Sequence, residues 1–423
     1  MKENKRAVWS WAFYDWGNSA YSTTVMAGFF PLFFKEYWAD PHNPNQSTFY
    51  LGMANSIASI VVASLAPLLG SIADQGSAQK KFLIFFSFLG AIMTGGLWMV
   101  SQGNWQLAVL FYVIATIGFA SGNVFYDSLL PGLASEERVD VVSSLGFGLG
   151  YLGGGLLFLV IVFMYLKPEI FGISDGATAI KLSFLSVAVW WAVFTIPLIL
   201  FVPEPKNYDA VDIKNAIQMG WIQLIQTFDE IRNMKVVGTF LLAYFFYIDG
   251  VDTIIKMAVD YGMSLNFSGE SLIIALLIVQ FVAFPAALIY GQLASKVGIK
   301  TAIMIGIIAY SFITFLGYFI TKAWHFYVLA ILIGLFQGGI QALSRSLYTR
   351  IIPAEKSAEF FGFYNMLGKF AAIIGPALMG TISLVTGSAR LGILSILLLF
   401  ILGAFFLNKV DLDEGKRLAA DGL

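Results

Sequence analysis

The stretch Gly70-Ser71-Ile72-Ala73-Asp74-Gln75-Gly76, which is followed by Lys80 and Lys81, has a second and more divergent copy in the same chain. That copy is Gly291-Gln292-Leu293-Ala294-Ser295-Lys296-Val297-Gly298, followed by Lys300. Each copy lies between the second and third long apolar segments of its half of the chain. A repeat of half the chain argues against a solenoid, whose units are about 20–50 residues long, and predicts two related helical bundles in a membrane.

The composition is that of a protein surrounded by lipid. Hydrophobic residues make up 58% of the 423 residues, charged residues make up 12%, and the mean hydropathy is +0.78. This composition leaves too little polar surface to cover a water-exposed globule. A net charge of −1 without basic, aromatic-rich runs argues against a nucleic-acid partner. Because the chain has no cysteine, it forms no disulfide and no Cys-ligated metal site.

Twelve apolar stretches are long enough to cross a bilayer, which takes about 20 residues per helix. They are residues 12–38, 49–73, 82–101, 105–130, 141–166, 181–203, 236–262, 271–293, 301–321, 324–349, 358–385 and 389–408. Most of the 25 Lys and Arg residues lie in the segments on the side of the N-terminus, so the positive-inside rule places both termini in the cytoplasm. The predicted fold is all-α: a multi-pass integral membrane protein with twelve transmembrane helices in two six-helix, pseudo-symmetric bundles.

The chain is expected to have four parts. Residues 1–203 form the N-terminal bundle, residues 236–408 the C-terminal bundle, and residues 409–423 a cytoplasmic tail. In the connector, residues 204–235, apolar residues recur at helical spacing among charged ones. This pattern predicts an amphipathic helix on the cytoplasmic face of the membrane.

Several motifs spread over nearly the whole chain carry a family resemblance. In the first half they are Trp11-Ala12-Phe13-Tyr14-Asp15-Trp16-Gly17-Asn18-Ser19-Ala20-Tyr21, Tyr126-Asp127-Ser128-Leu129-Leu130-Pro131 and Gly150-Tyr151-Leu152-Gly153-Gly154. In the second half they are Tyr247-Ile248-Asp249-Gly250-Val251-Asp252-Thr253-Ile254, Gln341-Ala342-Leu343-Ser344-Arg345-Ser346-Leu347 and Phe360-Phe361-Gly362-Phe363-Tyr364. With the repeated loop, the chain resembles the major facilitator superfamily and, within it, the vacuole-effluxer-like (UMF-type) family.

The resemblance implies the major facilitator fold and a secondary transporter. Its eukaryotic relatives are associated with the export of amino acids from the vacuole, and for a prokaryotic member the substrate does not carry over. The chain departs from the family at two positions. Asp252 stands where the family usually has an amide, and Ser295 replaces the acid of the second loop.

The repeated loops are expected to form a gate on the cytoplasmic side. The candidate gate residues are Gly70, Asp74, Lys80, Lys81, Gly291 and Lys296. Gly70 lets the second helix approach its neighbour, and Asp74 can accept hydrogen bonds from the unpaired amides at the N-terminus of the eleventh helix, where the helix dipole favours an anion. Lys80 and Lys81 either belong to this gate or only set the topology. Ser295 predicts a weaker contact between the second loop and the fifth helix.

Charged residues inside predicted spans cost at least about 2.5–3.5 kcal/mol at the bilayer centre, so they indicate function. Asp249, Asp252 and Lys256 follow an i, i+3, i+7 spacing, which predicts one face of the seventh helix turned toward the cavity between the bundles. Asp252 and Lys256 have the order that favours an ion pair. Asp249 is then the unpaired acid and a candidate proton carrier, with Gly250 permitting local unwinding. The alternative is a structural acid paired with Lys369.

Asp15 is the second candidate for proton coupling, and a helix N-terminal acid is the alternative. Asp127 and Arg345 lie on helices related by the duplication, and we expect an ion pair between them. The alternative is that Arg345 binds a substrate carboxylate. The candidate cavity residues are Asp252, Lys256, Lys369, Arg345, Asn123, Tyr126, Tyr244, Tyr247, Gln280, Gln337, Gln341, Tyr364 and Asn365.

Together these features predict a secondary active transporter that moves a small polar solute, such as an amino acid or similar zwitterion, by alternating access with proton coupling. An uncoupled facilitator or exporter is the alternative, and a transport-dead membrane sensor is less favoured. We expect no enzyme activity, cofactor or metal, since the only histidines, His42 and His325, are predicted far apart at the outer surface. The expected partners are the substrate, protons and the lipid of a bacterial cytoplasmic (inner) membrane, and we expect a monomer.

Overall fold

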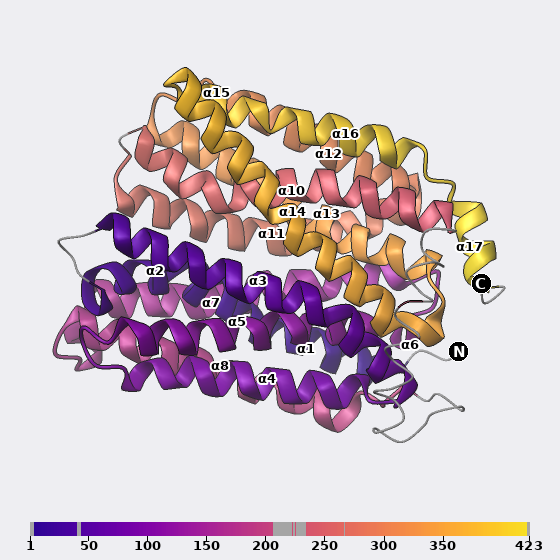
Figure 1. Ribbon diagram of the computed structural model, residues 1–423, viewed down its shortest axis with the longest axis horizontal. Helices are drawn as coiled ribbons and strands as arrows, with labels where there is room; N and C mark the ends of the chain where they lie inside the picture. The colour runs from indigo at the N-terminus through magenta and orange to yellow at the C-terminus, as the bar shows by residue number, and fades with distance from the viewer. Residues whose placement is uncertain are drawn as a thin grey trace.

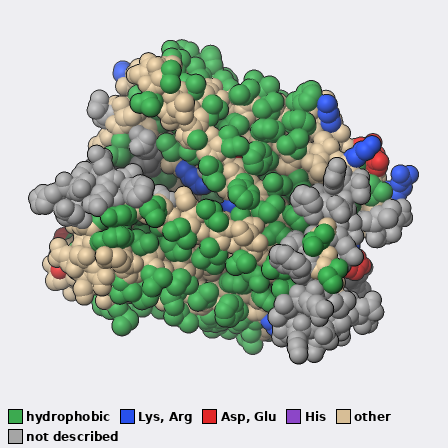
Figure 2. All heavy atoms as spheres, viewed as in Figure 1, with side chains coloured by type: hydrophobic (Ala, Val, Ile, Leu, Met, Phe, Trp, Pro, Cys, Tyr) green, Lys and Arg blue, Asp and Glu red, His purple; other side chains and the backbone are tan. Residues whose placement is uncertain are grey.

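The computed structural model is a bundle of long helices that run side by side (Figure 1). It describes residues 4–39, 44–205, 222, 225, 234–265 and 267–420. Eleven helices in these ranges are long and apolar enough to cross a membrane. Large apolar side chains such as Ile92, Ile308 and Leu398 are exposed, and hydrophobic atoms cover most of the face in Figure 2. Such a surface is suited to lipid and not to water.

The first half contains five long helices with three short turns between them. They are α3 (Pro44–Gln75), α4 (Gln79–Gly96), η3 (Leu97–Met99), α5 (Trp105–Ser128), α6 (Leu130–Leu133), α7 (Val139–Leu166), η4 (Pro168–Phe171) and α8 (Gly176–Phe201). The second half contains α10 (Lys235–Ser264), α11 (Gly269–Val297), α12 (Ile299–Gly317), α13 (Ala323–Ile351), η5 (Ala354–Lys356), α14 (Ser357–Thr386), α15 (Ala389–Ser395), α16 (Leu397–Asn408) and α17 (Leu412–Ala420). Helix α17 lies in the expected tail.

The first predicted span differs from the others. It is a run of four helical pieces, α1 (Lys5–Ala20), η1 (Tyr21–Phe29), α2 (Phe30–Phe33) and η2 (Phe34–Trp38), in which η1 and η2 are π-helical. None of the four alone is as long as a membrane span, so the count of twelve depends on treating the run as one. Nothing in the sequence predicted the π-helical turns, which are rare and occur often at functional sites.

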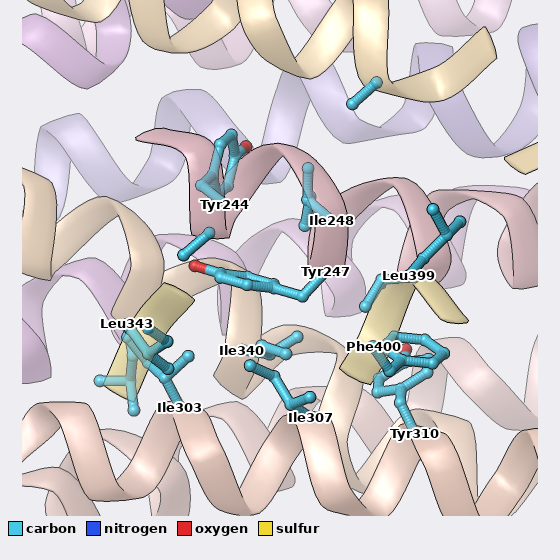
Figure 3. Close-up of a cluster of buried hydrophobic side chains, with 14 of the residues drawn as sticks. Tyr244, Tyr247, Ile248, Ile303, Ile307, Tyr310, Ile340, Leu343, Leu399 and Phe400 are labelled. Carbon is cyan, nitrogen blue, oxygen red and sulfur yellow. The ribbon is translucent and has the colours of Figure 1, made fainter. Parts of the chain in front are cut away.

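The buried apolar side chains fall into two clusters, one built mainly from α1–α8 and one mainly from α10–α16. Figure 1 shows the corresponding helices as two adjacent groups, indigo to magenta and pink to yellow. In the second cluster, α10, α12, α13 and α16 meet around Tyr247, Ile307, Ile340 and Phe400 (Figure 3). Each half therefore has a core of its own, and polar residues between the halves can form a site.

Both chain ends lie at the same end of the bundle (Figure 1). We call this end the terminal side and the opposite end the far side. The positive-inside rule is the basis for placing the terminal side in the cytoplasm. Most of the predicted connector, residues 206–221, 223–224 and 226–233, lies outside the described residues.

Candidate functional site

The two glycines that begin the repeated loops lie where the halves meet on the terminal side. A Cβ on Gly70 would collide with the backbone of Ala358 at the start of α14. A Cβ on Gly291 would collide with Ser144 near the start of α7. The missing side chains thus allow α3 to approach α14 and α11 to approach α7. In each half, the glycine that begins the loop therefore permits close packing against a helix of the other half.

Asp74 lies at the N-terminus of α14, in the contact that the sequence predicted. Its carboxylate accepts hydrogen bonds from the backbone N–H groups of Ala358 at 3.2 Å and Glu359 at 2.9 Å. Gln79 also donates its amide N–H to Asp74, and it donates to Ser357 Oγ at 3.2 Å. Gln79 was not among the predicted gate residues, and its position just after the loop was the only signal for it in the sequence. These contacts join α3 and α4 of the first half to α14 of the second.

The lysines of the loops make no such contact. Lys80 Nζ donates to the carbonyl oxygens of Ile199 and Val202, both at 2.7 Å, at the C-terminal end of α8. In the other half, Lys300 Nζ donates to the carbonyls at the end of α16, Asn408 at 2.7 Å and Val410 at 2.8 Å. Cations at helix C-termini satisfy unpaired carbonyls, so each lysine joins two helices of one half. Lys81 and Lys296, the remaining gate candidates, are exposed.

In the second loop, Ser295 does not repeat the contact that Asp74 makes to the other half. Ser295 is exposed and donates its hydroxyl to Gln292 O of its own helix at 2.7 Å. Instead, Asp140 in the first turn of α7 accepts from Arg350 at 2.9 Å and from the Ser346 hydroxyl, both on α13. The start of α7 is therefore joined to α13 of the second half by its own acid, Asp140, and not by an acid of the loop that faces it.

Asp127 and Arg345 form the ion pair that the sequence predicted, with 2.8 Å between Asp127 Oδ1 and the guanidinium. Arg345 is only 2% exposed and also donates to Ser143, from Nε to Oγ at 2.9 Å and from Nη2 to the backbone oxygen at 2.8 Å. A buried pair of this kind is strongly destabilised when one partner is removed. It joins α13 of the second half to α5 and α7 of the first.

Aromatic rings of the first half surround this guanidinium. The Arg345 Cζ lies 5.0 Å from the ring centre of Trp11, 5.3 Å from that of Tyr126 and 4.4 Å from that of Phe147. Trp11 stacks on Tyr126 at 4.3 Å and donates its indole N–H to the Tyr126 backbone oxygen at 2.9 Å. Cation–π contacts of this kind stabilise a desolvated cation. Trp11 and Phe147 were not among the predicted site residues.

A cavity of about 190 Å³ lies between the halves. It is lined by Asp15, Asn123, Tyr126, Asp127 and Phe147 from the first half and by Tyr244, Ile248, Asp252, Gln341, Arg345, Tyr364, Asn365, Gly368 and Lys369 from the second. Figure 2 shows Lys or Arg side chains in a hollow between the two groups of helices. Most of the predicted cavity residues therefore do line one cavity.

The charged groups of the cavity are not balanced. Once Asp127 is assigned to Arg345, the lining retains the acids Asp15 and Asp252 and one base, Lys369.

Lys256, one helical turn beyond Asp252, is exposed and does not belong to the lining. No ion pair within 4 Å joins Asp252 to Lys256 or Lys369, all three of which the structure describes, so the predicted Asp252–Lys256 pair is not formed. The i, i+4 spacing permits such a pair, but water competes for an exposed ammonium.

Asp15 belongs to the cavity and not to a helix N-terminus. It lies about 15 Å along α1 from Lys5, at about 1.5 Å per residue, and Asn4 provides the N-cap by accepting from the backbone N–H groups of Arg6 and Ala7. Asp15 Oδ1 accepts from the Ser19 hydroxyl at 3.0 Å. The alternative of a helix N-terminal acid is therefore wrong.

Asp249 does not line the cavity. It is 0% exposed, and its Oδ1 accepts from the Gly375 backbone N–H at 2.9 Å and from the Thr253 hydroxyl at 3.3 Å. Its Oδ2 has no hydrogen-bond partner among the described residues. Residues three apart on a helix point about 60° apart, so Asp249 turns toward α14 while Asp252 turns toward the cavity. The structure shows neither the predicted cavity position nor a pair with Lys369.

Gly250 does not unwind the seventh helix, because α10 is α-helical from Lys235 to Ser264 and a Cβ on Gly250 would contact the Phe400 ring at 2.7 Å. Three further candidates lie outside the cavity lining. Tyr247 is fully buried in the second core and its hydroxyl lies 2.6 Å from Ser344 Oγ. Gln337 is buried, and Gln280 packs against Gly155. These three side chains lie in helix–helix contacts and not in the cavity. The polarity of a side chain in a span therefore does not by itself indicate a cavity residue.

Two halves with separate cores, a polar cavity between them and closing contacts at one end are the arrangement of the major facilitator fold. The solved structures agree on the fold. The proton:xylose symporter XylE has a TM-score of 0.73 at 15% identity and covers 98% of this chain and 97% of its own. The human organic anion transporter MFSD10 (TETRAN) has a TM-score of 0.72 at 13% identity, covering 95% of this chain and 99% of its own. A bacterial homologue of the iron transporter ferroportin in its outward-facing state has 0.66 at 13% identity, with 97% and 99% coverage.

The chain belongs to the family described as "Vacuole effluxer Atg22 like", whose model matches residues 42–420. It is 41% identical to the uncharacterized MFS-type transporter YxiO of Bacillus subtilis over 413 residues, which are 97% of this chain and 96% of that protein. It is 29% identical to autophagy-related protein 22 of Saccharomyces cerevisiae over 416 residues, which cover 86% of this chain and 77% of that protein. These relatives confirm the family predicted from the motifs, and the protein is a multi-pass membrane transporter of the MFS type.

Proposed function

We propose that the protein is a secondary active transporter that moves a small zwitterion, of the amino-acid type, by alternating access coupled to a proton. The observation that carries this proposal is the charge pattern of the cavity. With Asp127 assigned to Arg345, a substrate carboxylate can bind Lys369 and the guanidinium edge, while a substrate ammonium can bind Asp15 or Asp252.

The size of the cavity supports a small solute. Its volume of about 190 Å³ is below the range of about 300–1,000 Å³ that is usual for drug-sized ligands. Aromatic and apolar side chains, among them Phe147, Tyr244 and Ile248, share the lining with the charges. Such a wall suits the hydrocarbon part of a small solute whose two charged groups are bound separately.

The excess of acids over bases in the cavity lining supports proton coupling. Two acids face one base, so the second acid must bind either a substrate ammonium or a proton. Asp15 is the first candidate, because it lies in the cavity with one hydrogen bond, to Ser19, and no cation within 4 Å among the described side chains. Asp249 is the second candidate, since intramembrane acids commonly form proton relays.

In alternating access, the contacts at the terminal side would break when the cavity opens there. These contacts are Asp74 with the start of α14, Asp127 with Arg345, and Asp140 with Arg350. We expect the terminal side to face the cytoplasm of a bacterium, in the inner membrane, with both termini inside, and the protein to act as a monomer.

The test is ligand-dependent thermal stabilisation of the purified protein, followed by uptake into proteoliposomes. A ligand that binds the folded state raises its apparent stability. We expect some L-amino acids to raise Tm, while their N-acetyl and decarboxylated derivatives, which each lack one charge, do not. Stabilisation by sugars alone, or by no zwitterion in the panel, would contradict the proposal.

Coupling is tested with the zwitterion that stabilises the protein. Asp15→Asn should abolish accumulation driven by a pH difference and leave exchange of substrate across the membrane measurable. Asp413→Asn, at an exposed acid of α17, is the matched control and should accumulate normally. Accumulation by both Asp15→Asn and Asp249→Asn would exclude the two candidates.

An uncoupled facilitator is the second candidate function, and one observation favours it. Lys256 lies one helical turn from Asp252, a spacing that permits an ion pair in another state of the transport cycle, although the pair is not formed in this structure. If its ammonium balances one cavity acid, no acid is left for a proton. Substrate flux in proteoliposomes would then be independent of the pH difference and never exceed equilibrium.

A further inference from the structure

Helix α14 contacts both halves of the molecule. Its first residues, Ala358 and Glu359, donate their N–H groups to Asp74 of α3. One turn later, a Cβ on Gly362 would lie 2.6 Å from Pro67 Cα, also in α3. The N-terminal part of α14 is therefore packed on the first half as well as on the second, where the Tyr348 hydroxyl donates to the Phe360 carbonyl at 2.9 Å and Tyr364 stacks on Tyr244.

The C-terminal part of α14 is packed on the second half. Gly375 donates its backbone N–H to Asp249 of α10 at 2.9 Å. Beyond this point, a Cβ on Gly392 of α15 would collide with Ser383 and lie 2.7 Å from the Met379 backbone oxygen. Gly368 and Lys369, which line the cavity, lie between the two parts. The first part must leave α3 when the terminal side opens, whereas the contact of Gly375 with α10 lies within the second half and does not have to break.

The sequence contains a weak point where the two parts meet. Pro376 lies inside α14 and has no N–H to bond the carbonyl four residues earlier, which is the usual cause of a helix kink. The residue before it, Gly375, is buried against α10. A Cβ there would collide with Thr253 Oγ1 and lie 2.7 Å from Asp249 Oδ1. The close approach of the two helices thus requires glycine at this position.

Within the part of the chain that the structure describes, Asp249 has only two hydrogen-bond partners. Its carboxylate is fully buried in a membrane protein, where an acid is costly, and its two hydrogen bonds in the described structure go to Gly375 N–H and to the Thr253 hydroxyl. A carboxylate oxygen is a strong acceptor for a backbone N–H. The acid therefore holds the backbone of α14 at the residue that precedes the proline.

We propose that Asp249 is the positioning residue of a hinge in α14, and that residues 357–374 swing about Gly375 and Pro376 when the contact with Asp74 opens. We call residues 357–374 the arm. Because Asp249 holds the pivot in one position, the arm moves between two defined positions. It carries Tyr364, Asn365 and Lys369 of the cavity with it. The proposal rests on the alternating access proposed above, and it does not require that Asp249 carry a proton.

Distances across the terminal side test the hinge. The chain has no cysteine, so Glu137→Cys and Glu355→Cys, both at exposed positions, accept one spin label each. In lipid nanodiscs without substrate, the pair should give one narrow distance peak. Adding Asp74→Asn should produce a second, longer peak, because the arm is released from α3. The state in which α14 has separated from α3 can then be measured without knowing the substrate.

Four variants in this background separate the possibilities. Asp249→Leu removes the acceptor and Gly375→Ala forces α14 away from Thr253, so both should replace the second peak by a broad distribution and reduce its population by about tenfold or more. Asp249→Asn keeps an acceptor oxygen and should retain both peaks. Gly380→Ala, on the same helix with no atom within 4 Å of the added Cβ, is the matched control and should also retain them.

In the background that keeps Asp74, Asp249→Leu and Gly375→Ala should broaden the single distance peak. The test therefore does not depend on the appearance of the longer-distance peak in Asp74→Asn. If the two distance peaks of Asp249→Leu had unchanged widths, the hinge proposal would be overturned. It would also be overturned if the distance distribution of Asp249→Asn were as broad as that of Asp249→Leu. Loss of proton-driven accumulation in Asp249→Asn with both peaks retained would support the hinge and also a proton role. Normal accumulation in Asp249→Asn with both peaks retained would exclude only its role in coupling.

Discussion

Replacing Asp74 by asparagine should shift the protein toward a state open on the terminal side. The buried carboxylate accepts two backbone N–H groups of α14, at 2.9 and 3.2 Å. An asparagine offers one acceptor oxygen, so one of these N–H groups would face an amide N–H instead. A hydrogen bond to a charged group contributes about 1.5–3 kcal/mol and the charge at a helix N-terminus about 0.3–1 kcal/mol. The closed state should therefore lose about 2–4 kcal/mol, which is roughly a 30-fold to 1,000-fold change in the open-to-closed ratio.

The assay is the labelling of a buried cysteine between the halves. Ala342 is 0% exposed and its carbonyl accepts from the Ser143 hydroxyl of the first half at 2.7 Å, so Ala342→Cys reports opening. A membrane-impermeant maleimide should label it faster in Asp74→Asn than in the parent. Asp175→Asn is the matched control, because Asp175 caps α8 by accepting from Thr178 N–H at 2.8 Å within one half. Equal labelling of all three proteins would refute the reasoning and leave Asp74 with a role in topology alone.

Three further predictions follow from the contacts between and within the halves. Arg345→Lys should lower the free energy of unfolding by about 1.5–3 kcal/mol, because an ammonium keeps a positive charge near Asp127 but cannot replace the directed bonds from the guanidinium to Ser143. Thermal unfolding measures this loss. Lys80→Met and Lys300→Met should each cost about 1–3 kcal/mol of stability, because each leaves two helix-end carbonyls unpaired, without changing Ala342→Cys labelling. A hydrogen bond from Lys416 lowers the pKa of Glu136, so this contact contributes stability above the usual carboxyl pKa and loses it as the pH falls through the lowered value. Lys416→Ala should therefore lower the free energy of unfolding at pH 7 by about 0–1 kcal/mol at this exposed pair, and the difference should shrink as the pH falls below about 4, roughly the ordinary carboxyl pKa.

Much of the fold was predictable because membrane spans are set by local composition. The expected span 105–130 corresponds to α5 (Trp105–Ser128), 141–166 to α7 (Val139–Leu166) and 324–349 to α13 (Ala323–Ile351). Each needs only enough apolar residues to cross the hydrocarbon and polar residues that stop it. The first span was the exception, since its π-helical turns have no compositional signal.

Parts of the site were predictable because the duplication relates residues far apart in the chain. It paired the helices of Asp127 and Arg345, while the preference of an acid for a helix N-terminus predicted the contact of Asp74 with the start of α14. The roles of Asp15 and Asp249 were not predictable in this way. Asp15 lines the cavity, whereas the Asp249 carboxylate faces Gly375. The sequence had favoured Asp249 over Asp15 as the acid of the cavity that carries a proton, so their positions are the reverse of that expectation.

By itself, the sequence determined a membrane protein, its duplicated halves and the family, because apolar length, charge bias and motifs are all written along the chain. Only the tertiary structure decided which intramembrane charge faces the cavity. Helical periodicity states which residues share a face, but the rotation of a helix depends on the partners that it packs against. For α10 those partners are Phe400 against Gly250, and Gly375 against Asp249 and Thr253, and these close contacts turn Asp252 to the cavity and bury Asp249.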